Sequence, residues 1–420
     1  MKRLAVFIMF LLSPLFLFPQ EANYDESKVP KYVLPELLKL KNGREVKTSR
    51  EWMEKRRPEI LTDFETQMYG RVPGKLEAAD VKVVEESHDA FGGKATRKQV
   101  RLTFRKGDRE LNVMVLLYIP NKVQPAPLFL GLNFDGNQAV CSDPKILLTD
   151  SWIENDASLG ITNHHVSEKS RGAHTGRWCV EKLLDNGFGL ATAYYGDIDP
   201  DRNDFSDGPH PFFYKAGQVK PAPDEWGSIA AWAWGLSRIM DYLETDKDVD
   251  AQKITVIGHS RLGKTALWAG ATDQRFAIVV SNCSGCGGAA LSRRAYGETV
   301  ERINTVFPHW FCDNFKKYNN DESALPVDQH MLIALIAPRP VYIASAADDR
   351  WADPKGQYLS GYFATKVYNL FGLVGLTSPD QPPLNTPVMT QIGYHIREGG
   401  HDITPYDWDQ YIKFVKMHLK

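Results

Sequence analysis

Residues 253–270 read KITVIGHSRLGKTALWAG, and this stretch decides the fold class. The β-branched run at 254–257 predicts a buried strand, and the apolar residues along 261–270 predict a helix after a Gly-His-Ser turn. A strand, a tight turn and a helix form the setting of a nucleophile elbow, which lifts a serine hydroxyl off a sheet edge. The helix N-terminus also offers partial positive charge to a developing oxyanion. We therefore interpret Ser260 as a nucleophile rather than an ordinary turn serine, although Gly263 comes one place later than in G-x-S-x-G.

Strand-like apolar runs recur on both sides of this elbow. The expected strands are residues 111–120, 127–133, 190–195, 254–257, 277–281 and 340–344. Residues 225–244 carry apolar side chains at three- and four-residue steps, which indicates a helix. Strands that alternate with helices over this length predict an α/β protein whose mostly parallel sheet is covered by helices on both faces.

The chain shows no internal repeat, low-complexity tract or linker, so we expect one domain over residues 21–420. Residues 21–60 are polar and punctuated by proline, and we expect them to wrap the surface. A loop is expected to be inserted at one rim over about residues 142–178. Its histidines are His164, His165 and His174. Their spacing fits no known metal-ligand set, so we interpret them as solvated loop residues.

Composition and charge exclude several classes of protein. The 420 residues are 43% hydrophobic and 24% charged, the balance of an ordinary globular protein, which excludes a disordered or collagen-like chain. The 50 basic and 52 acidic residues give a net charge of −2. The chain therefore lacks the basic surplus of a nucleic-acid-binding protein, and no nucleic-acid partner is expected.

The first twenty residues have the pattern of a secretory signal peptide. Lys2 and Arg3 precede an apolar run at 4–18, which ends at Pro19. The run is short for a bilayer span, so export with cleavage is favoured over a membrane anchor. We expect the mature protein to be periplasmic or secreted, since no later stretch is long and apolar enough to cross a membrane.

Cysteine usage sets a further expectation. The five cysteines are Cys141, Cys179, Cys283, Cys286 and Cys312. An odd number in an exported chain leaves at least one unpaired. We expect mainly buried thiols, and the sequence leaves open whether two of them form a disulfide. Cys283 and Cys286 form a C-x-x-C spacing, but there is no second pair to complete a zinc site.

A serine nucleophile needs a base and an acid, which follow it in the order Ser, acid, His in proteins with this elbow. His401 lies in the turn EGGHD before a helix expected at 407–419, and it is the favoured base. His395, in a strand-like stretch and interpreted as structural, and His330 are its rivals. The acid should follow the late strand at 340–344. Asp348, Asp349 and Asp353 all lie there, and the residues alone do not choose among them.

Two cations, Arg261 and Lys264, follow the nucleophile. Ser260 and Lys264 are four residues apart, so both side chains lie on the same side of the helix. Cations beside a nucleophile would stabilise negative charge or hold hydroxyl groups. The alternative, judged from spacing alone, is a solvated charged face of the helix.

Together these motifs resemble carbohydrate esterase family 15, the glucuronoyl esterases, in its bacterial branch. The motifs are GHSRLGK (258–264), SGCGGAAL (284–291), YGET (296–299), DDRWADP (348–354), EGGHD (398–402) and ATAYYGDIDPD (191–201). The resemblance runs from about residue 30 to the end, and the elbow with its Arg and Lys is far more specific than a generic hydrolase serine. It implies an α/β-hydrolase fold that needs no metal or cofactor.

The resemblance also implies a role for each matching residue. Ser260 would be the nucleophile and His401 the base, Arg261 would stabilise the oxyanion, Lys264 would bind sugar hydroxyls, and Glu298 and Trp351 would line a uronate pocket. One position departs from the family pattern, since Cys283 stands where many members carry a catalytic Glu. A thiol has an unperturbed pKa of ~8.5, against ~4.3 for Glu, so it replaces an anion poorly. Some bacterial members place the acid in the loop matching DDRWADP, which favours Asp349 over Asp348.

We therefore expect a carboxylic ester hydrolase that works through an acyl-enzyme. Its substrate would be the ester between (4-O-methyl-)glucuronic acid of glucuronoxylan and lignin alcohols, and the enzyme would act as a monomer. One alternative is a xylan acetyl esterase, for which Lys264, Glu298 and Trp351 would have no sugar acid to hold. The other is a carbohydrate-binding pseudo-enzyme that lost its acid at Cys283.

Overall fold

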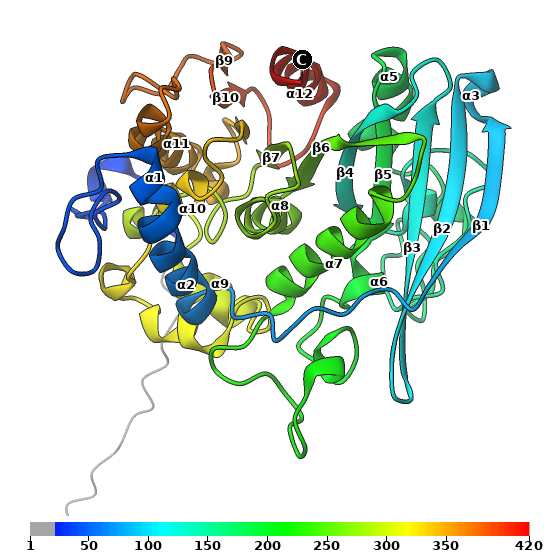
Figure 1. The fold of residues 1–420 in the computed structure, drawn as a ribbon, viewed down its shortest axis with the longest axis horizontal. Helices are drawn as coiled ribbons and strands as arrows, with labels where there is room; N and C mark the ends of the chain where they lie inside the picture. The colour runs from blue at the N-terminus through cyan, green and yellow to red at the C-terminus, as the bar shows by residue number, and fades with distance from the viewer. Residues whose placement is uncertain (1–21, 420) are drawn as a thin grey trace, which may run out of the picture.

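The computed structural model describes residues 22–419, so the expected signal segment lies outside the described residues. Its strands form one ten-stranded sheet in the order β1-β2-β3-β5-β4-β6-β7-β8-β10-β9 (Figure 1). The strands are β1 (Asp80–Asp89), β2 (Ala95–Lys106), β3 (Arg109–Pro120), β4 (Ala126–Asn133), β5 (Gly189–Tyr194), β6 (Val249–His259), β7 (Ile278–Asn282), β8 (Val341–Ala346), β9 (Val388–Met389) and β10 (Ile392–Arg397).

The centre of the sheet is parallel, as expected. Strands β5, β4, β6, β7, β8 and β10 run in one direction, whereas β1, β2, β3 and β9 pair antiparallel with their neighbours. The six expected strands correspond to β3 through β8, with ends shifted by a few residues. The α/β class is confirmed, and the carboxyl ends of the parallel strands meet at one edge, where sites form in such sheets.

Strands β1 and β2 were not predicted, because their sequence looks like polar surface. The β1 side chains are mostly exposed, but β2 buries charged residues that the pattern does not reveal as buried. Arg97 pairs with Glu85 and Asp143, each at 2.6 Å. These buried charges are tolerated since each has an oppositely charged partner within hydrogen-bond distance.

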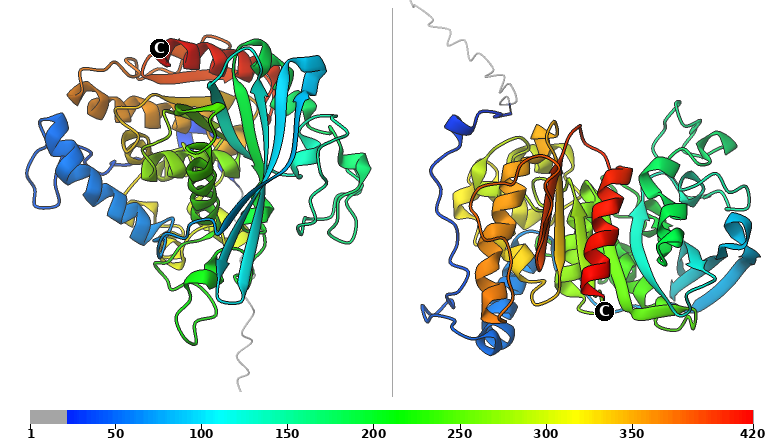
Figure 2. Two further views of the ribbon diagram at one scale, coloured as in Figure 1. Left: turned by 45° about the vertical axis from the view of Figure 1, so that its right-hand side comes forward. Right: turned by 90° about the horizontal axis from the view of Figure 1, so that it is seen from above.

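Helices cover both faces of the sheet. The longer ones are α2 (Arg57–Gln67), α5 (Val180–Asp185), α7 (Ser228–Leu243), α8 (Arg261–Thr272), α9 (Val300–Val306), α10 (Gln329–Ala334), α11 (Pro354–Leu370) and α12 (Pro405–His418). Residues of α7, α8, α10 and α11 share one hydrophobic cluster, and residues of α5 and α12 share a second. Figure 2 shows α11 (orange) and α12 (red) on either side of β10. The expected helices at 225–244 and 407–419 are confirmed as α7 and α12.

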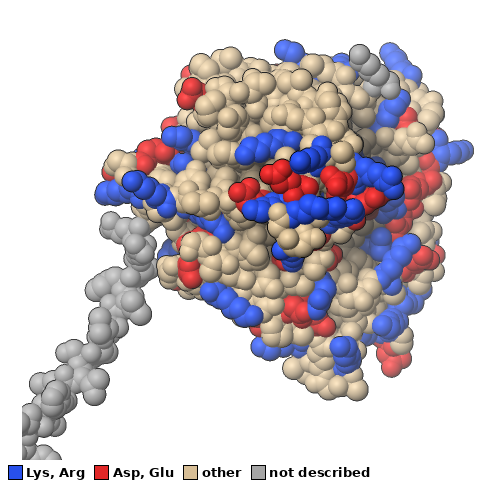
Figure 3. Space-filling view, turned by 60° about the vertical axis from the view of Figure 1, so that its left-hand side comes forward, with Lys and Arg blue, Asp and Glu red and all other residues tan. Residues whose placement is uncertain are grey.

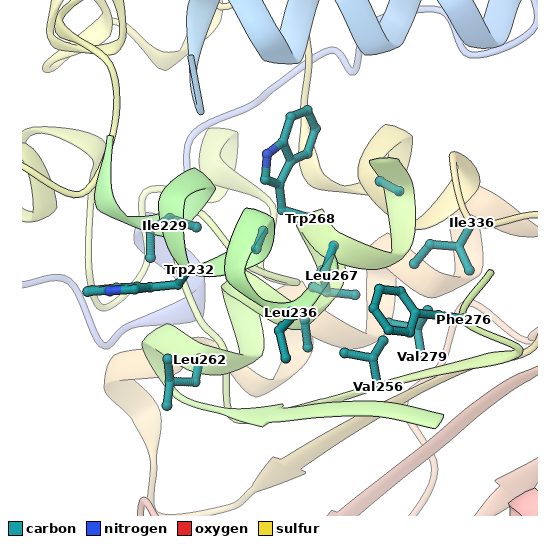
Figure 4. Packing of buried hydrophobic residues seen from close by; sticks show 14 of the residues in the cluster. Ile229, Trp232, Leu236, Val256, Leu262, Leu267, Trp268, Phe276, Val279 and Ile336 are labelled. Atoms are coloured by element: carbon teal, nitrogen blue, oxygen red, sulfur yellow. The ribbon is translucent and has the colours of Figure 1, made fainter. Parts of the chain in front are cut away.

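The larger cluster holds the nucleophile helix against the sheet. Figure 4 shows Ile229, Trp232 and Leu236 of α7 beside Leu262, Leu267 and Trp268 of α8. These side chains are almost completely buried, and Val256 of β6 and Val279 of β7 pack against them. The apolar faces of α7 and α8 thus fix the start of α8, where Ser260 lies.

Two expectations about loops are corrected. Residues 49–60 do not wrap the surface, because α1 (Ser49–Glu51), a π-helical turn and α2 bury Trp52 and Ile60. Two of the loop histidines are not merely solvated. His164 stacks on Trp152 with ring centroids 4.9 Å apart, and His174 bonds Asp135 at 2.6 Å.

The cysteines form no disulfide within the described residues, which answers the question that the sequence left open. All five cysteines lie within the described residues and all are free; Cys179 is partly exposed and the others are buried. A chain that buries a core of this size is stable without such a cross-link.

Two observations on the described residues concern membranes and nucleic acids as partners. No helix within residues 22–419 combines the length and apolar character that a membrane span requires. Basic and acidic side chains are intermixed on the face drawn in Figure 3 rather than gathered into one basic surface.

Candidate active site

Ser260 occupies a strained turn between β6 and α8. Its backbone φ is 56° and ψ −127°, a conformation that side-chain-bearing residues rarely adopt. Gly258 makes the turn possible, because a Cβ there would lie 1.9 Å from the carbonyl oxygen of Leu262. The Ser260 amide donates to the carbonyl of Asn282 at 2.9 Å, which fastens the turn to the end of β7. The predicted elbow is therefore present as a tight strand–turn–helix unit.

Asp349 and His401 meet above the ends of β8 and β10. His401 Nδ1 donates to Asp349 Oδ2 at 2.7 Å, and the aspartate side chain is only 4% exposed, against 42% for the histidine. Of the other acid candidates, Asp348 is exposed, and Asp353 is buried in an ion pair with Arg294 at 2.8 Å. Of the three aspartates, only Asp349 hydrogen-bonds His401.

The rival histidines have other partners. His395 is buried between Asp407 at 2.8 Å and the Tyr342 hydroxyl at 3.0 Å. His330 is buried against the carbonyl of Pro35, and burial lowers its pKa to about 4. Both rings are engaged in the protein interior, which agrees with a structural role.

His259, which the sequence did not single out, links the elbow to His401. The two imidazole rings lie 4.5 Å apart between centroids, and Ser260 is the next residue in the chain. His259 Nδ1 donates to Asn282 Oδ1 at 2.7 Å, and burial lowers its pKa to about 3, so the ring stays neutral. His401 donates from Nδ1, which leaves its Nε2 lone pair free. Within residues 22–419 the Ser260 hydroxyl makes no hydrogen bond to His401.

Arg261 lies in an aromatic setting with a buried counter-ion, Asp201. Its guanidinium carbon lies 4.6 Å from the Trp310 ring centroid, and the group forms an ion pair with Asp201. Asp201 Oδ1 also accepts from His309 at 2.8 Å and from the Trp310 indole at 2.7 Å. Burial alone would raise the pKa of Asp201, but the His309 hydrogen bond and the Arg261 charge outweigh it and hold the pKa at about 2. The aspartate therefore stays charged and fixes the arginine beside the nucleophile.

The Nε–H donor of Arg261 is uncommitted. Its Nε–H is buried, and no group among the described residues accepts from it. A buried donor without an acceptor carries a desolvation cost of about 1–3 kcal/mol. An oxyanion formed within reach of this group would remove that cost.

Lys264 does not lie on a solvated helix face. It is buried, donates to the carbonyl of Ser284 at 2.7 Å and lies 3.6 Å from Glu298 Oε2. Burial raises the pKa of Glu298, and the charge of Lys264 opposes this effect. The structure thus brings both residues together, with Trp351, 37% exposed, on the adjoining loop.

The loops that carry Glu298 and Trp351 are joined to each other. The Glu298 amide donates to the carbonyl of Trp351 at 2.9 Å. Gly297 has a φ of +66°, and a Cβ there would lie 2.3 Å from the Trp351 carbonyl oxygen, so only glycine permits this approach. A cavity of about 430 Å³ opens beside Trp351 and Gly297.

An N-terminal strap, residues 23–28, holds both loops. Its contacts are Asn23 O with the Gly297 amide (2.8 Å), Tyr24 O with the Tyr296 hydroxyl (3.2 Å) and with Arg350, and the Glu26 carboxylate with Lys355 (2.9 Å) and with Arg294. The Tyr24 ring also lies under the Arg350 guanidinium, 5.0 Å from its centroid. The strap therefore connects the Glu298 loop to the Trp351 loop from outside.

Cys283 lies beside the Asp349–His401 pair. It follows β7 directly, is 1% exposed and has a φ of 48°. Its sulfur, a carboxylate oxygen of Asp349 and a ring nitrogen of His401 all lie within 4.8 Å of one another. Position 283, where the family resemblance would place a Glu, and Asp349 thus approach the same histidine.

Comparison with known proteins agrees with this architecture. Residues 178–372 match a family model described as "Glucuronyl esterase, fungi". Carbohydrate esterase MZ0003, from an unknown prokaryotic organism, is 51% identical over 403 residues, which cover 96% of this chain and 93% of that protein. The solved glucuronoyl esterase from Solibacter usitatus is 48% identical, with a TM-score of 0.89 over 94% of this chain and 100% of that one. The 4-O-methyl-glucuronoyl methylesterase of Podospora anserina is 34% identical over 319 residues, 72% of this chain and 64% of that protein. The chain therefore belongs to carbohydrate esterase family 15, the glucuronoyl esterases, and has their α/β-hydrolase fold.

Proposed function

We propose that this protein is a serine esterase that hydrolyses the ester between (4-O-methyl-)glucuronic acid of glucuronoxylan and lignin alcohols. The observation that carries the proposal is the buried Asp349 carboxylate on His401 Nδ1, at 2.7 Å, beside the elbow that bears Ser260. This arrangement leaves the other imidazole nitrogen able to accept a proton. The names of the relatives support a (4-O-methyl-)glucuronoyl ester as the substrate class.

The mechanism has two acyl-transfer steps. His401 Nε2 takes the Ser260 proton while Ser260 Oγ attacks the uronate carbonyl, and Asp349 stabilises the imidazolium that forms. Arg261, with backbone N–H groups at the start of α8, stabilises the tetrahedral oxyanion. His401 then gives the proton to the leaving alcohol. In the second step a water molecule, deprotonated by His401, releases free glucuronate and restores Ser260.

Lys264, Glu298 and Trp351 are proposed to hold the sugar acid. The Lys264–Glu298 pair is buried at 5% and 7% exposure, so its polar atoms are available only to a group that enters the site. Sugar hydroxyls can accept from the lysine and donate to the glutamate, and the Trp351 ring offers an apolar face. An acetyl esterase would have no use for these three groups, and the Asp349 carboxylate on His401 supports an active enzyme over a pseudo-enzyme.

Trp351→Ala is expected to raise KM for a benzyl glucuronate ester by about five- to tenfold, since an aromatic contact contributes about 1 kcal/mol or more. Hydrolysis of an aryl acetate should change less than twofold because acetate does not reach the ring. Steady-state kinetics on both esters measure this. A wild-type enzyme that prefers the acetate, or an equal loss on both esters in the variant, would contradict the proposed substrate.

The strap gives a second prediction. Tyr24→Ala combined with Glu26→Gln removes its aromatic and ionic contacts with both loops, and we expect a three- to tenfold higher KM for the glucuronate ester, with aryl acetate hydrolysis unchanged. Lys28→Ala is the matched control, because Lys28 is exposed and its nearest acid, Asp25 of the strap itself, is 4.0 Å away. A variant that loses both activities equally would indicate general destabilisation and not loop positioning.

We further propose that the chain is exported with removal of residues 1–20, that residues 21–420 act as one domain with 142–178 inserted, and that it works as a monomer. The charged and apolar pattern of residues 2–18 supports export. Glucuronoxylan is a polymer that an enzyme must meet outside the cell.

A further inference from the structure

The Cys283 thiol has no role in the proposed mechanism, yet it lies within 4.8 Å of ligand atoms of Asp349 and His401. Cys286, in the same C-x-x-C motif, is equally buried but lies toward Glu298 and Lys264. The group of Cys283, Asp349 and His401 is the one set of three His, Cys, Asp or Glu residues within 22–419 whose ligand atoms converge in this way.

The three side chains offer the ligand atoms that zinc prefers in proteins. Thiolate sulfur, imidazole nitrogen and carboxylate oxygen bind Zn²⁺ at about 2.0–2.3 Å, which separates the ligand atoms of a tetrahedral site by about 3.3–3.8 Å. The three atoms need only modest shifts to reach that spacing, and His401, whose side chain is 42% exposed, can supply much of the movement. Its exposure also gives an ion a route from solvent and leaves room for a water as the fourth ligand.

The charges around the thiol favour a cation. Burial first, and then the carboxylates of Asp349 and Asp407, raise the pKa of the Cys283 thiol against the opposing effect of the Arg397 guanidinium, so the thiol keeps its proton until a cation displaces it. The same two carboxylates attract a cation to the thiol. Arg397 is committed to Asp407 at 2.9 Å and to backbone carbonyls, so its charge is largely compensated. The site itself would carry two negative charges once the thiol has lost its proton.

We propose that Cys283, Asp349 and His401 form a binding site for a thiol-seeking divalent cation such as Zn²⁺, and that the bound ion reversibly inhibits the esterase. The ion binds the sulfur, whose proton is released to solvent, one oxygen of Asp349, and Nδ1 of His401. The imidazole stays neutral, and its proton moves from Nδ1 to Nε2. The catalytic part of this inference rests on the proposed function of His401.

The inhibition follows from this tautomer. With the ion on Nδ1, Nε2 carries the ring proton and has no lone pair to accept the proton of Ser260. Asp349 is at the same time engaged by the ion and no longer orients the ring. A glutamate at position 283 would offer a carboxylate oxygen in place of the thiolate, so the preference for thiol-seeking cations arises from the residue by which this chain departs from the family pattern.

The test compares chelator-treated wild type, Cys283→Ala, Cys283→Ser and Cys286→Ala, the last being a matched control that removes a buried thiol from the same motif. Benzyl glucuronate hydrolysis is measured against added Zn²⁺ and normalised to each variant's own metal-free rate. Cd²⁺ is titrated in parallel and followed by ultraviolet Cd–thiolate absorption. We expect wild type and Cys286→Ala to be inhibited, with recovery on adding EDTA, and to show the absorption band.

Both Cys283 variants should lose the band and need at least tenfold more Zn²⁺ for half inhibition. Unchanged Zn²⁺ sensitivity in the Cys283 variants, or no band in wild type, would overturn the proposed site. The band reports binding without turnover, so it tests the site even if the ester proves to be the wrong substrate. Failure of the proposed function would instead appear as absent metal-free hydrolysis in wild type. If Cys283→Ala does not fold, Cys283→Ser supplies the same comparison with a side chain of nearly equal size.

Discussion

Asp349→Asn is expected to lower kcat/KM for a benzyl glucuronate ester by about 10³- to 10⁴-fold, whereas Asp348→Asn should leave it within about twofold. Asp349 accepts the Nδ1 proton of His401 at 2.7 Å from a buried position. An asparagine there can present its NH₂ group to the ring and stabilise the wrong tautomer, and it does not stabilise the imidazolium. Asp348 is exposed and precedes Asp349 in the chain, but it does not hydrogen-bond His401. Asp348→Asn therefore measures how much activity is lost through local disturbance alone.

The comparison is decisive because the two variants differ by one position. Thermal unfolding of both should stay close to wild type, since each replaces a carboxylate by an isosteric amide. Activity that survives in Asp349→Asn but is lost in Asp348→Asn would reverse the assignment. Full activity in both would mean that His401 works without either acid.

Arg261→Ala is expected to lower kcat by about 10²- to 10³-fold, the range for loss of one oxyanion donor, and to raise KM much less. The carbonyl of the ester is neutral, so the guanidinium gains most as the oxyanion forms, which is selective stabilisation of the transition state. The uncommitted Nε–H of Arg261 is the donor that carries this expectation. Asp201 keeps its bonds from His309 and Trp310 in the variant, which limits structural damage.

The kinetic parameters separate this role from simple binding. A higher KM with unchanged kcat would show that Arg261 binds the substrate equally well in the ground state and the transition state. Arg261→Lys is the matched variant, because it keeps the charge near Asp201 but removes the planar set of donors. We expect it to recover only a small part of kcat.

Much of the sheet could be predicted because its central strands are continuous apolar runs. Residues 254–257 and 341–344 are buried in the parallel part of the sheet, and their continuous apolar sequence predicts this burial. Strand β2 could not be predicted in the same way. Arg97 and Lys98 look like surface residues, and their burial depends on partners up to 150 positions distant, such as Asp248.

The candidate site, too, could be predicted only where the signal is local in the sequence. Ser260 carries a local signal, and the chain order of the fold limits where its base and acid lie. The choice of Asp349 over Asp348 depends on which side chain turns toward a histidine 52 residues away, which no local pattern encodes. His259 and Asp201 were missed as functional residues because each acts through tertiary contacts. Asp201 does lie in the quoted ATAYYGDIDPD stretch, which is where a signal could have been found.

The proposed mechanism depends on one covalent event, the transfer of a glucuronoyl group to Ser260. The direct measurement is rapid quenching of the wild-type enzyme with a glucuronate ester of a good leaving group, followed by mass spectrometry of the peptide that contains residues 258–264. We predict a burst of released alcohol and a glucuronoyl mass increase on Ser260, both absent in Ser260→Ala. Turnover at the wild-type rate in Ser260→Ala, or the acyl group found on another residue, would contradict the role of Ser260 as nucleophile.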